Sequence, residues 1–505
     1  MNTQRSASPS ESLISAESRV AAGEGRDRIA QMETRGVDYI PPVERNSRPA
    51  NLAWTFFGVQ FGYTIFVLGG LLPVFGLSWW PSFWAVITGS VIGSVAVAAT
   101  ALIGPKSGTN STVSSVASFG IRGRYLGSII AQFDNLGFNV IVIWTGGLGL
   151  VATMHRLAGT GTGTGPLVLG MAIVAVGMSV FGLLGHATLV AGYKFVAVSS
   201  VIAIGIFMVV NAHHFHAQLP HGSAYALGSF WPTWLLGVTL ALVNPISYGV
   251  GINDYARRIP EDASPRRLVT ALAGGMFSGN ALACLVGVFV TLSLTSVDTP
   301  LVSGMIQLTP GWFLIPFALT GFVSSIAGGG IDMYNATLDL HAILFKLSRP
   351  ANAAIIIVVT FVVTYLAVVV YNATTTITSF ATVLSVLLGP WIAILIVRHF
   401  ELGTRYHVLD LHAYAGEHKG AYWYSAGFGA RAMIVWAVST AVGLLWSSTT
   451  LYVGPLTHVS DGIDLSFIVA FVLGGVLYYA WGTLAPLASE RVAPAVAPVM
   501  VTESR

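Results

Sequence analysis

Long apolar segments constrain this chain more than any other feature of its sequence. Stretches such as 82–103 and 353–370 are mostly apolar, and about 20 such residues suffice for a helix to cross a bilayer. A transmembrane β-barrel is excluded, because its strands alternate apolar and polar residues. Only 9% of the 505 residues are charged, which is too few to cover a soluble globule. We therefore predict an all-α integral membrane protein.

The apolar segments also predict how the chain is organised. The first 50 residues are polar, lack the apolar core of a signal peptide and are expected to form a disordered tail, with a second tail at 485–505. Residues 51–397 would form a core of ten helices and 398–484 two further helices. The twelve segments lie at 52–78, 82–104, 125–153, 166–184, 187–211, 231–252, 268–295, 311–338, 351–371, 374–397, 428–447 and 463–484.

The basic residues test this count of twelve. Lys and Arg in short loops stay on the cytoplasmic side of a membrane. With the amino terminus inside and twelve crossings, 23 of the 24 Lys and Arg residues fall inside, and only Arg156 falls outside. One helix more or fewer would exchange the sides of every later loop. We therefore predict a multi-pass protein of the inner or plasma membrane with both termini cytoplasmic.

Two carboxyl groups lie within apolar segments. Asp134 is in the third segment and Asp332 in the eighth, and Asp339 lies near the end of the eighth. A carboxylate at membrane depth costs several kcal/mol unless it is paired or protonated, so such residues are functional candidates.

The first and sixth segments contain residues that interrupt helices. The first carries Gly58, Gly62, Gly69 and Gly70, and residues 244–251 of the sixth read NPISYGVG. Proline removes a backbone donor and clashes with the preceding turn. Corresponding breaks in the first helix of two five-helix halves are typical of inverted-repeat transporters, whose site lies at the breaks. Asp134 and Asp332 would then be repeat mates around a central cavity.

Several short motifs resemble those of a known family. Residues 104–108 read GPKSG, 118–123 read SFGIRG, 254–260 read DYARRIP and 332–336 read DMYNA. Together they resemble the signatures of the nucleobase:cation symporter-1 family, the cytosine, purine and hydantoin permeases. The likeness extends from about Asn51 to His341. It implies a LeuT-type inverted five-plus-five repeat with two extra helices and uptake of a flat nitrogenous ring with Na⁺ or H⁺.

The candidate substrate site combines this resemblance with helical spacing. Asn135, Phe138 and Asn139 share a helix face with Val142, and the resemblance implies that Phe138 stacks on the ring. Hydantoin-type members of the family carry tryptophan and glutamine where this chain has Phe138 and Val142. The family's tryptophan of the sixth segment is also absent, and residues 244–248 fill that region. We expect the substrate to contact Asp134, Asn135, Phe138, Asn139, Asn244, Ser247, Tyr248, Asp332 and Asn335.

The coupling cation has two candidate sites. Unwound backbone at Gly62 and Tyr63, with the hydroxyls of Ser324 and Ser325, would suit Na⁺. A second hydroxyl expected beside Ser325 is replaced by Ile326, which leaves proton coupling through Asp134 or Asp332 open.

Each of these residues also has a structural interpretation. Phe138 could be ordinary packing, the two asparagines could join helices, the acids could bond backbone at a helix break, and the serines could bend a helix. The pair Arg257 and Arg258 suits an anchoring loop better than a gate.

The sequence also limits the classes of function. No phosphate-binding loop, metal-protease spacing or hydrolase constellation is found, so we expect no enzyme, no cofactor, no resident metal and no nucleic-acid partner. A transporter of cytosine or a purine fits best. The alternatives are a carrier of allantoin, a hydantoin, uracil or a pyridine-type vitamin, or a passive channel or receptor that uses the same cavity.

Overall fold

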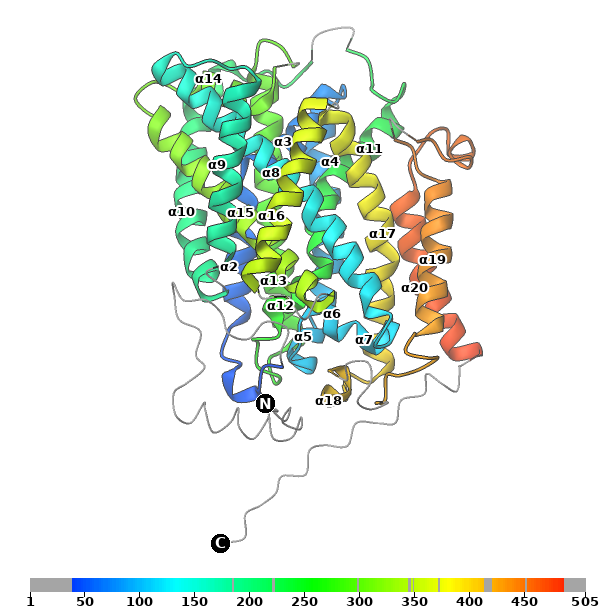
Figure 1. Ribbon diagram of the computed structural model, residues 1–505. Coiled ribbons are helices and arrows are strands. Elements are labelled where there is room, and N and C mark those ends of the chain that lie inside the picture. Colours follow the sequence, from blue (N-terminus) through cyan, green and yellow to red (C-terminus); the bar gives the residue numbers. More distant parts are fainter. Residues whose placement is uncertain are drawn as a thin grey trace.

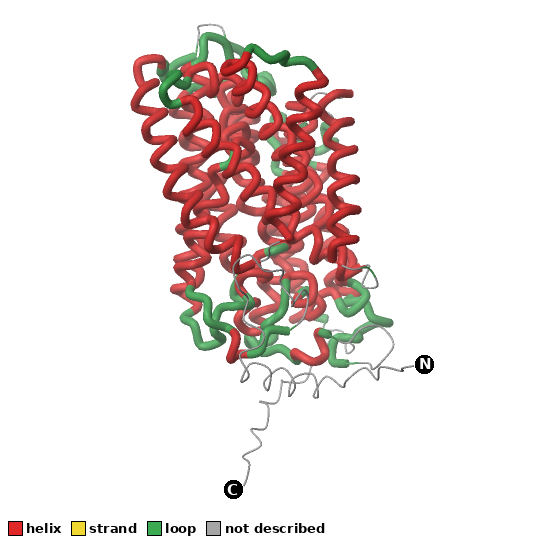
Figure 2. The backbone as a smooth tube through the Cα atoms, turned by 60° about the vertical axis from the view of Figure 1, so that its left-hand side comes forward, coloured by secondary structure: helices red, strands yellow, loops and turns green. Residues whose placement is uncertain are grey.

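A computed structural model describes residues 39–183, 186–219, 223–297, 299–343, 347, 349–370, 373–412, 420–449 and 452–485. Both predicted tails lie largely outside these residues. The described residues form helices and loops and contain no β-strand beyond two isolated bridges. Long helices run alongside one another, with connecting loops at the two ends of the bundle (Figures 1 and 2).

Ten helices among the described residues are long and apolar enough to cross a membrane, or eleven if the bent first pair is counted as one. The prediction of an all-α membrane protein is confirmed, but this criterion does not reach twelve spans. The remaining apolar helix, α19 (Ala430–Leu445), has only 16 residues, with Gly429 and Trp446 as its cap residues. The ten long helices are α4 (Trp79–Thr100), α8 (Arg124–Ala158), α9 (Thr164–Leu183), α10 (His186–Asn211), α11 (Phe230–Ser247), α13 (Pro265–Ser293), α15 (Leu314–Ile343), α16 (Arg349–Tyr365), α17 (Ala373–Glu401) and α20 (Ser466–Leu484).

The first predicted span is broken. Helix α2 (Pro49–Gly58) and the 3₁₀ turn Val59–Phe61 are followed by Gly62 in an extended conformation, and α3 (Tyr63–Val74) departs at 62°. The break leaves backbone groups without their helical partners in the middle of the bundle, where such groups are tolerated only around a cavity or beside other protein groups.

The sixth predicted span is distorted rather than bent. Helix α11 continues through Pro245 to Ser247, tightens into the 3₁₀ turn Tyr248–Val250, and gives way after Gly251 to α12 (Ile252–Ala256). The expected interruption therefore lies at the end of this span. Proline has no N–H to donate to the carbonyl four residues earlier, here that of Ala241. Helix α11 continues through Pro245 because the side chain of Asn280 on α13 donates a hydrogen bond of 2.9 Å to that carbonyl instead.

Glycines allow α3 to pack closely against α13. A Cβ on Gly287 would lie 1.9 Å from the carbonyl oxygen of Phe66, and one on Gly69 would lie 2.0 Å from that of Cys284. Small residues let helix backbones approach in a membrane, where no hydrophobic force drives helices together. This packing holds the second half of the broken span in place.

Short helices gather at one end of the bundle, the lower end in Figure 1: α5 (Ile103–Ser107), α6 (Ser111–Ser114), α7 (Val116–Phe119), α12 and α18 (Val408–Leu411). Three of the four family-like motifs, at 104–108, 118–123 and 254–260, lie at this end, whereas 332–336 lies within α15 (Leu314–Ile343). The backbone N–H of Ser111 donates to Asp254 at 2.8 Å, and Lys106 donates to the carbonyl of Glu261 at 3.1 Å. Arg257 is fully buried. These contacts agree with the anchoring role expected for the loop after the sixth segment.

Candidate functional site

A small internal cavity lies between the broken first span and helices α8, α11 and α15. The volume that water centres can reach within it is about 20 Å³, which is room for only a water or two. A ring substrate would therefore need the surrounding helices or side chains to move apart. The lining residues are Val59, Gly62, Thr64, Ile65, Phe138, Val142, Asn244, Ser247, Tyr248, Ser325, Gly328 and Asp332.

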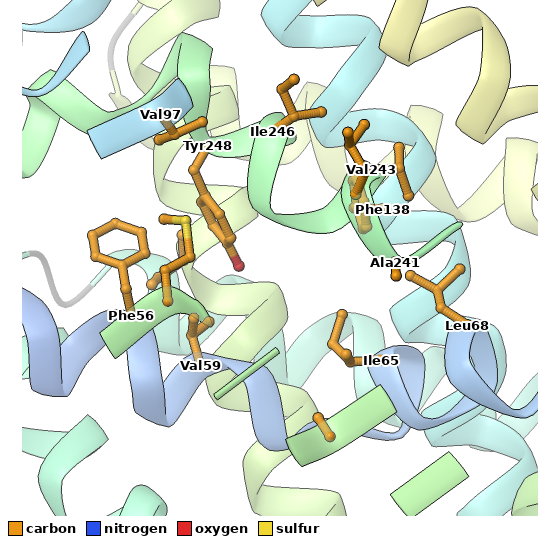
Figure 3. Close-up of a cluster of buried hydrophobic side chains, with 14 of the residues drawn as sticks. Phe56, Val59, Ile65, Leu68, Val97, Phe138, Ala241, Val243, Ile246 and Tyr248 are labelled. Atoms are coloured by element: carbon orange, nitrogen blue, oxygen red, sulfur yellow. The ribbon is translucent and has the colours of Figure 1, made fainter. Parts of the chain in front are cut away.

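Figure 3 shows how the apolar and aromatic part of this lining is arranged. Tyr248 extends from the turn after α11 toward the break in the first span, where Val59 and Ile65 lie. The edge of the Tyr248 ring contacts Phe56, with ring centroids 5.0 Å apart. Phe138 of α8 packs edge-on against Phe380 of α17, with ring centroids 5.6 Å apart. This contact supports the Phe138 ring.

The structure brings seven of the thirteen expected site residues to this cavity: Gly62, Phe138, Asn244, Ser247, Tyr248, Ser325 and Asp332. The other six do not line it. Asn135 donates a long hydrogen bond of 3.5 Å to Asp339, and Ser324 pairs with Ser200 of α10 at 2.9 Å. The ring of Tyr63 packs beside Gly149 and Gly321, so Tyr63 can offer only its backbone to the break.

Asp134, Asn139 and Asn335 are buried away from the cavity lining. Within the described part of the chain, Oδ1 of Asp134, both amide atoms of Asn139 and Oδ1 of Asn335 have no hydrogen-bond partner. Each side chain is at most 5% exposed. Buried polar atoms are normally paired with protein or ordered water, so these three side chains mark positions for ordered water.

A network of side-chain amides sets the orientation of Asn244. Gln60 donates to the carbonyl of Phe56 and Asn280 donates to that of Ala241. Because a carbonyl can only accept, the side-chain oxygens of Gln60 and Asn280 must face Asn244, whose Nδ2 donates to both at 2.5 and 2.8 Å. Both amide hydrogens of Asn244 are thereby used. Its Oδ1 is left as a hydrogen-bond acceptor for the cavity.

Gln60 and Asn280 are the residues that sequence reasoning missed. Each is a fully buried amide inside an apolar segment. A lone amide in an apolar segment could have identified both residues from the sequence, because polar residues in membrane helices bond to other helices or contribute to a site. Their connection to Asn244 depends on three different helices and could not be read from spacing.

The break in the first span lies against α15. The backbone N–H of Tyr63 donates to Oγ of Ser325 at 3.4 Å, and a Cβ on Gly62 would be 3.8 Å from the Ser324 carbonyl and the Ser325 hydroxyl. The Val59 carbonyl is 3.6 Å from the Cβ position of Gly328. Ile326 instead packs against Gly177 of α9. Carbonyl and hydroxyl oxygens at an unwound helix are ligands that suit Na⁺.

Four acidic side chains connect the cavity with the end of the bundle that carries the motifs. Asp332 lines the cavity, and the carboxyl of Asp134 is close enough to those of Asp332 and Asp339 to feel their charge. Asp339 in turn interacts with Asp254 of α12. Neighbouring carboxyls in a region of low dielectric constant do not all ionise together, so this series can hold protons at membrane depth.

The broken first span, the distorted sixth span and a cavity between them define a membrane transporter of the LeuT-type fold. The solved structure of Mhp1, described as a nucleobase-cation-symport-1 family transporter in a closed conformation with bromovinylhydantoin bound, matches with a TM-score of 0.68 and 19% identity. The match covers 92% of this chain and 98% of that one.

Sequence comparison assigns the family. Residues 39–470 match the family model for permeases for cytosine/purines, uracil, thiamine and allantoin, and the chain belongs to this family of nucleobase-cation symporters. The "Putative purine-cytosine permease YxlA" of Bacillus subtilis is 24% identical over 89% of this chain and 95% of its own length. The purine-uracil permease NCS1 of Arabidopsis thaliana is 22% identical over 87% of this chain and 76% of its own. The expectations of a transporter and of this family are thereby confirmed.

Proposed function

We propose that the protein imports a nucleobase-like ring, cytosine or a purine, by proton symport with alternating access. The observation that carries this proposal is the convergence of Phe138, Asn244 and Asp332 on one cavity beside the broken first span. A flat ring needs an aromatic face to stack on and polar groups to pair its edge. The cavity offers both.

The amide network favours a substrate edge that donates a hydrogen bond. Asn244 presents an acceptor to the cavity, since its amide hydrogens are engaged by Gln60 and Asn280. Asp332 can accept when ionised and donate when protonated. A ring N–H or an exocyclic amino group, as in cytosine and adenine, would suit Asn244. A ring that offers only carbonyl groups at that edge would be rejected.

Asp332 favours the proton as the coupling ion. It is the acid that lines the cavity, so its protonation and substrate occupancy can influence each other directly. The alternative ion is Na⁺, which the oxygen groups at Gly62 and Ser325 favour. A single measurement separates the two: whether uptake follows an imposed pH gradient or an imposed sodium gradient.

We further propose that α19 is a twelfth crossing, so that both termini are cytoplasmic and the motif end of the bundle faces the cytoplasm. At 16 residues α19 spans about 24 Å, which a locally thinned bilayer accommodates. The one basic residue expected outside, Arg156, donates to the carbonyls of Ile306 and Gln307 at the end of α14 (Leu301–Leu308), where a cation is favourable.

The decisive experiment measures accumulation of labelled rings in proteoliposomes. We expect cytosine, adenine or guanine to accumulate above the external concentration when the lumen is alkaline, and a protonophore to abolish this. Hydantoins, allantoin and uracil form the comparison panel. Equilibration without accumulation under either ion gradient would instead indicate a passive channel and would contradict symport.

A further inference from the structure

We propose that Asp134 and Asp339 form a proton route that leads from Asp332 in the cavity to the end of the bundle where α6 meets α12. This inference rests on the proton coupling proposed above and assigns its path. It is carried by the arrangement of side chains on the facing helices α8 and α15.

The first step joins Asp332 to Asp134. Their carboxyls interact electrostatically, and the hydroxyl of Tyr248 is within range of both. Oδ1 of Asp134 is buried and has no hydrogen-bond partner among the described residues, so it is open to a proton or a water molecule. A change of charge on Asp332 is therefore felt first by Asp134.

The second step joins Asp134 to Asp339. Asp339 lies seven residues after Asp332 on α15, about 10 Å further along the helix, which is too far for direct transfer. Asp134 on the facing helix interacts with both carboxyls. Asp339 accepts hydrogen bonds from Thr112 at 2.5 Å and from Asn135 at 3.5 Å. These hydrogen bonds fix the Asp339 carboxyl beside α6 and α8, so it is placed to receive a proton from the side of Asp134.

An independent observation on the same helix face points to water along this route. Asn335 lies one turn from both Asp332 and Asp339 on α15. It is 5% exposed, its Oδ1 has no partner in the described chain, and its amide nitrogen lies 2.9 Å from the Cβ position of Gly251, which directly precedes α12. A buried amide oxygen beside two carboxyls is a position for a bridging water.

The third step leads to the motif end. Asp339 interacts with Asp254 of α12, whose carboxylate accepts from the backbone of Ser111. Arg257 is the neighbouring cation and donates to the carbonyl of Asp254. The titratable and charged groups that face the route are thus Tyr248 from the turn after α11, and Asp254 and Arg257 from α12.

The transfer conserves charge at each step. The carboxylic acid of Asp332 gives its proton to the Asp134 carboxylate, Asp134 passes it to Asp339, and Asp339 releases it to water at the motif end. The three carboxyls return to their starting protonation when Asp332 takes up a new proton from the opposite side of the membrane.

The test compares substrate-coupled proton flux with substrate exchange in proteoliposomes that contain a pH-sensitive dye. We expect Asp339→Asn and Asp134→Asn each to slow coupled proton flux and pH-driven accumulation about tenfold or more, because an amide side chain cannot take up and release a proton as a carboxyl does. Counterflow of the labelled ring, which needs no net proton movement, should continue. Asp339→Glu should restore proton flux. Asp464→Asn, which alters a buried acid outside the route, is the matched control.

Two outcomes would overturn the route. If the wild type is driven by protons and both Asn variants move protons normally, the route is wrong while proton symport stands. If the wild type moves only with sodium and no protons enter, the proposed coupling and the route fail together. Should Asp339→Asn not reach the membrane, Thr112→Val replaces it in the same assay, and unchanged flux in it and in Asp134→Asn would also overturn the route.

Discussion

Nδ2 of Asn280 donates a hydrogen bond of 2.9 Å to the carbonyl oxygen of Ala241. Pro245 cannot serve that carbonyl, because proline has no N–H. The same side chain accepts from Asn244 and so fixes which end of Asn244 faces the cavity. The continuity of helix α11 and the orientation of Asn244, a proposed substrate contact, therefore both depend on Asn280.

Replacing this residue should affect both stability and binding. Asn280→Ala leaves the Ala241 carbonyl and an Asn244 amide hydrogen without partners, at a cost of about 1–3 kcal/mol for each buried group. We expect a lower melting temperature in detergent and weaker ring binding, measured by thermal unfolding and by titration. Asn280→Asp keeps the acceptor for Asn244 but loses the donor to Ala241, so it should lose stability while better preserving affinity. Equal affinity in Asn280→Ala and the wild type would contradict the network.

Phe138 should contribute to affinity through stacking. Removing an aromatic ring that stacks on a base costs about 1–3 kcal/mol, or about 5- to 150-fold in affinity. We expect Phe138→Ala to weaken binding within that range and Phe138→Trp to retain it. Phe133→Ala on the same helix is the control, because Phe133 lies outside the cavity lining and is 37% exposed. An equal loss in both Ala variants would mean that Phe138 acts only through packing.

The close contact of α3 and α13 predicts a steric defect. A methyl group on Gly287 would lie 1.9 Å from the carbonyl oxygen of Phe66, so Gly287→Ala must push the helices apart. We expect a large loss of monodisperse protein after detergent extraction. Gly274→Ala on α13 meets open space and should extract like the wild type. A normal yield of Gly287→Ala would show that the helices do not approach this closely.

Acid should destabilise the motif end through His412. Burial, and then the charges of Arg124 and Arg257, lower the pKa of His412 to about 4. In the unfolded chain the imidazole titrates near pH 6.5, so above that pH it is neutral in both the folded and the unfolded state. Its contribution to the free energy of unfolding is therefore complete above pH 6.5. The contribution is lost as the pH falls from 6.5 toward 4. The melting temperature should therefore drop less between pH 7 and pH 5 in His412→Gln than in the wild type, whereas His458→Gln, at an exposed site, should follow the wild type.

The sequence was sufficient for the membrane class, the broken first span and the family, because each depends on local composition or contiguous motifs. Apolar length indicates a crossing whatever the neighbours are. Asn244 and Asp332 could also be predicted, since an amide and an acid within apolar segments each cost enough to need a reason. Phe138 was predicted from the family resemblance together with helical spacing.

Only the tertiary structure decided which of these side chains line the cavity and which pair with other helices. Asn135 and Asn139 are on the predicted helix face beside Phe138 but do not line the cavity, and Asn135 pairs with Asp339 of α15. Helical spacing defines a face and cannot say which neighbour covers it. Pro245 was expected to interrupt its span, yet α11 continues through it because Asn280, 35 residues away, supplies the missing donor. Contacts between distant segments form only when the whole bundle packs, so the chain determined its spans and the packed helices determined the site.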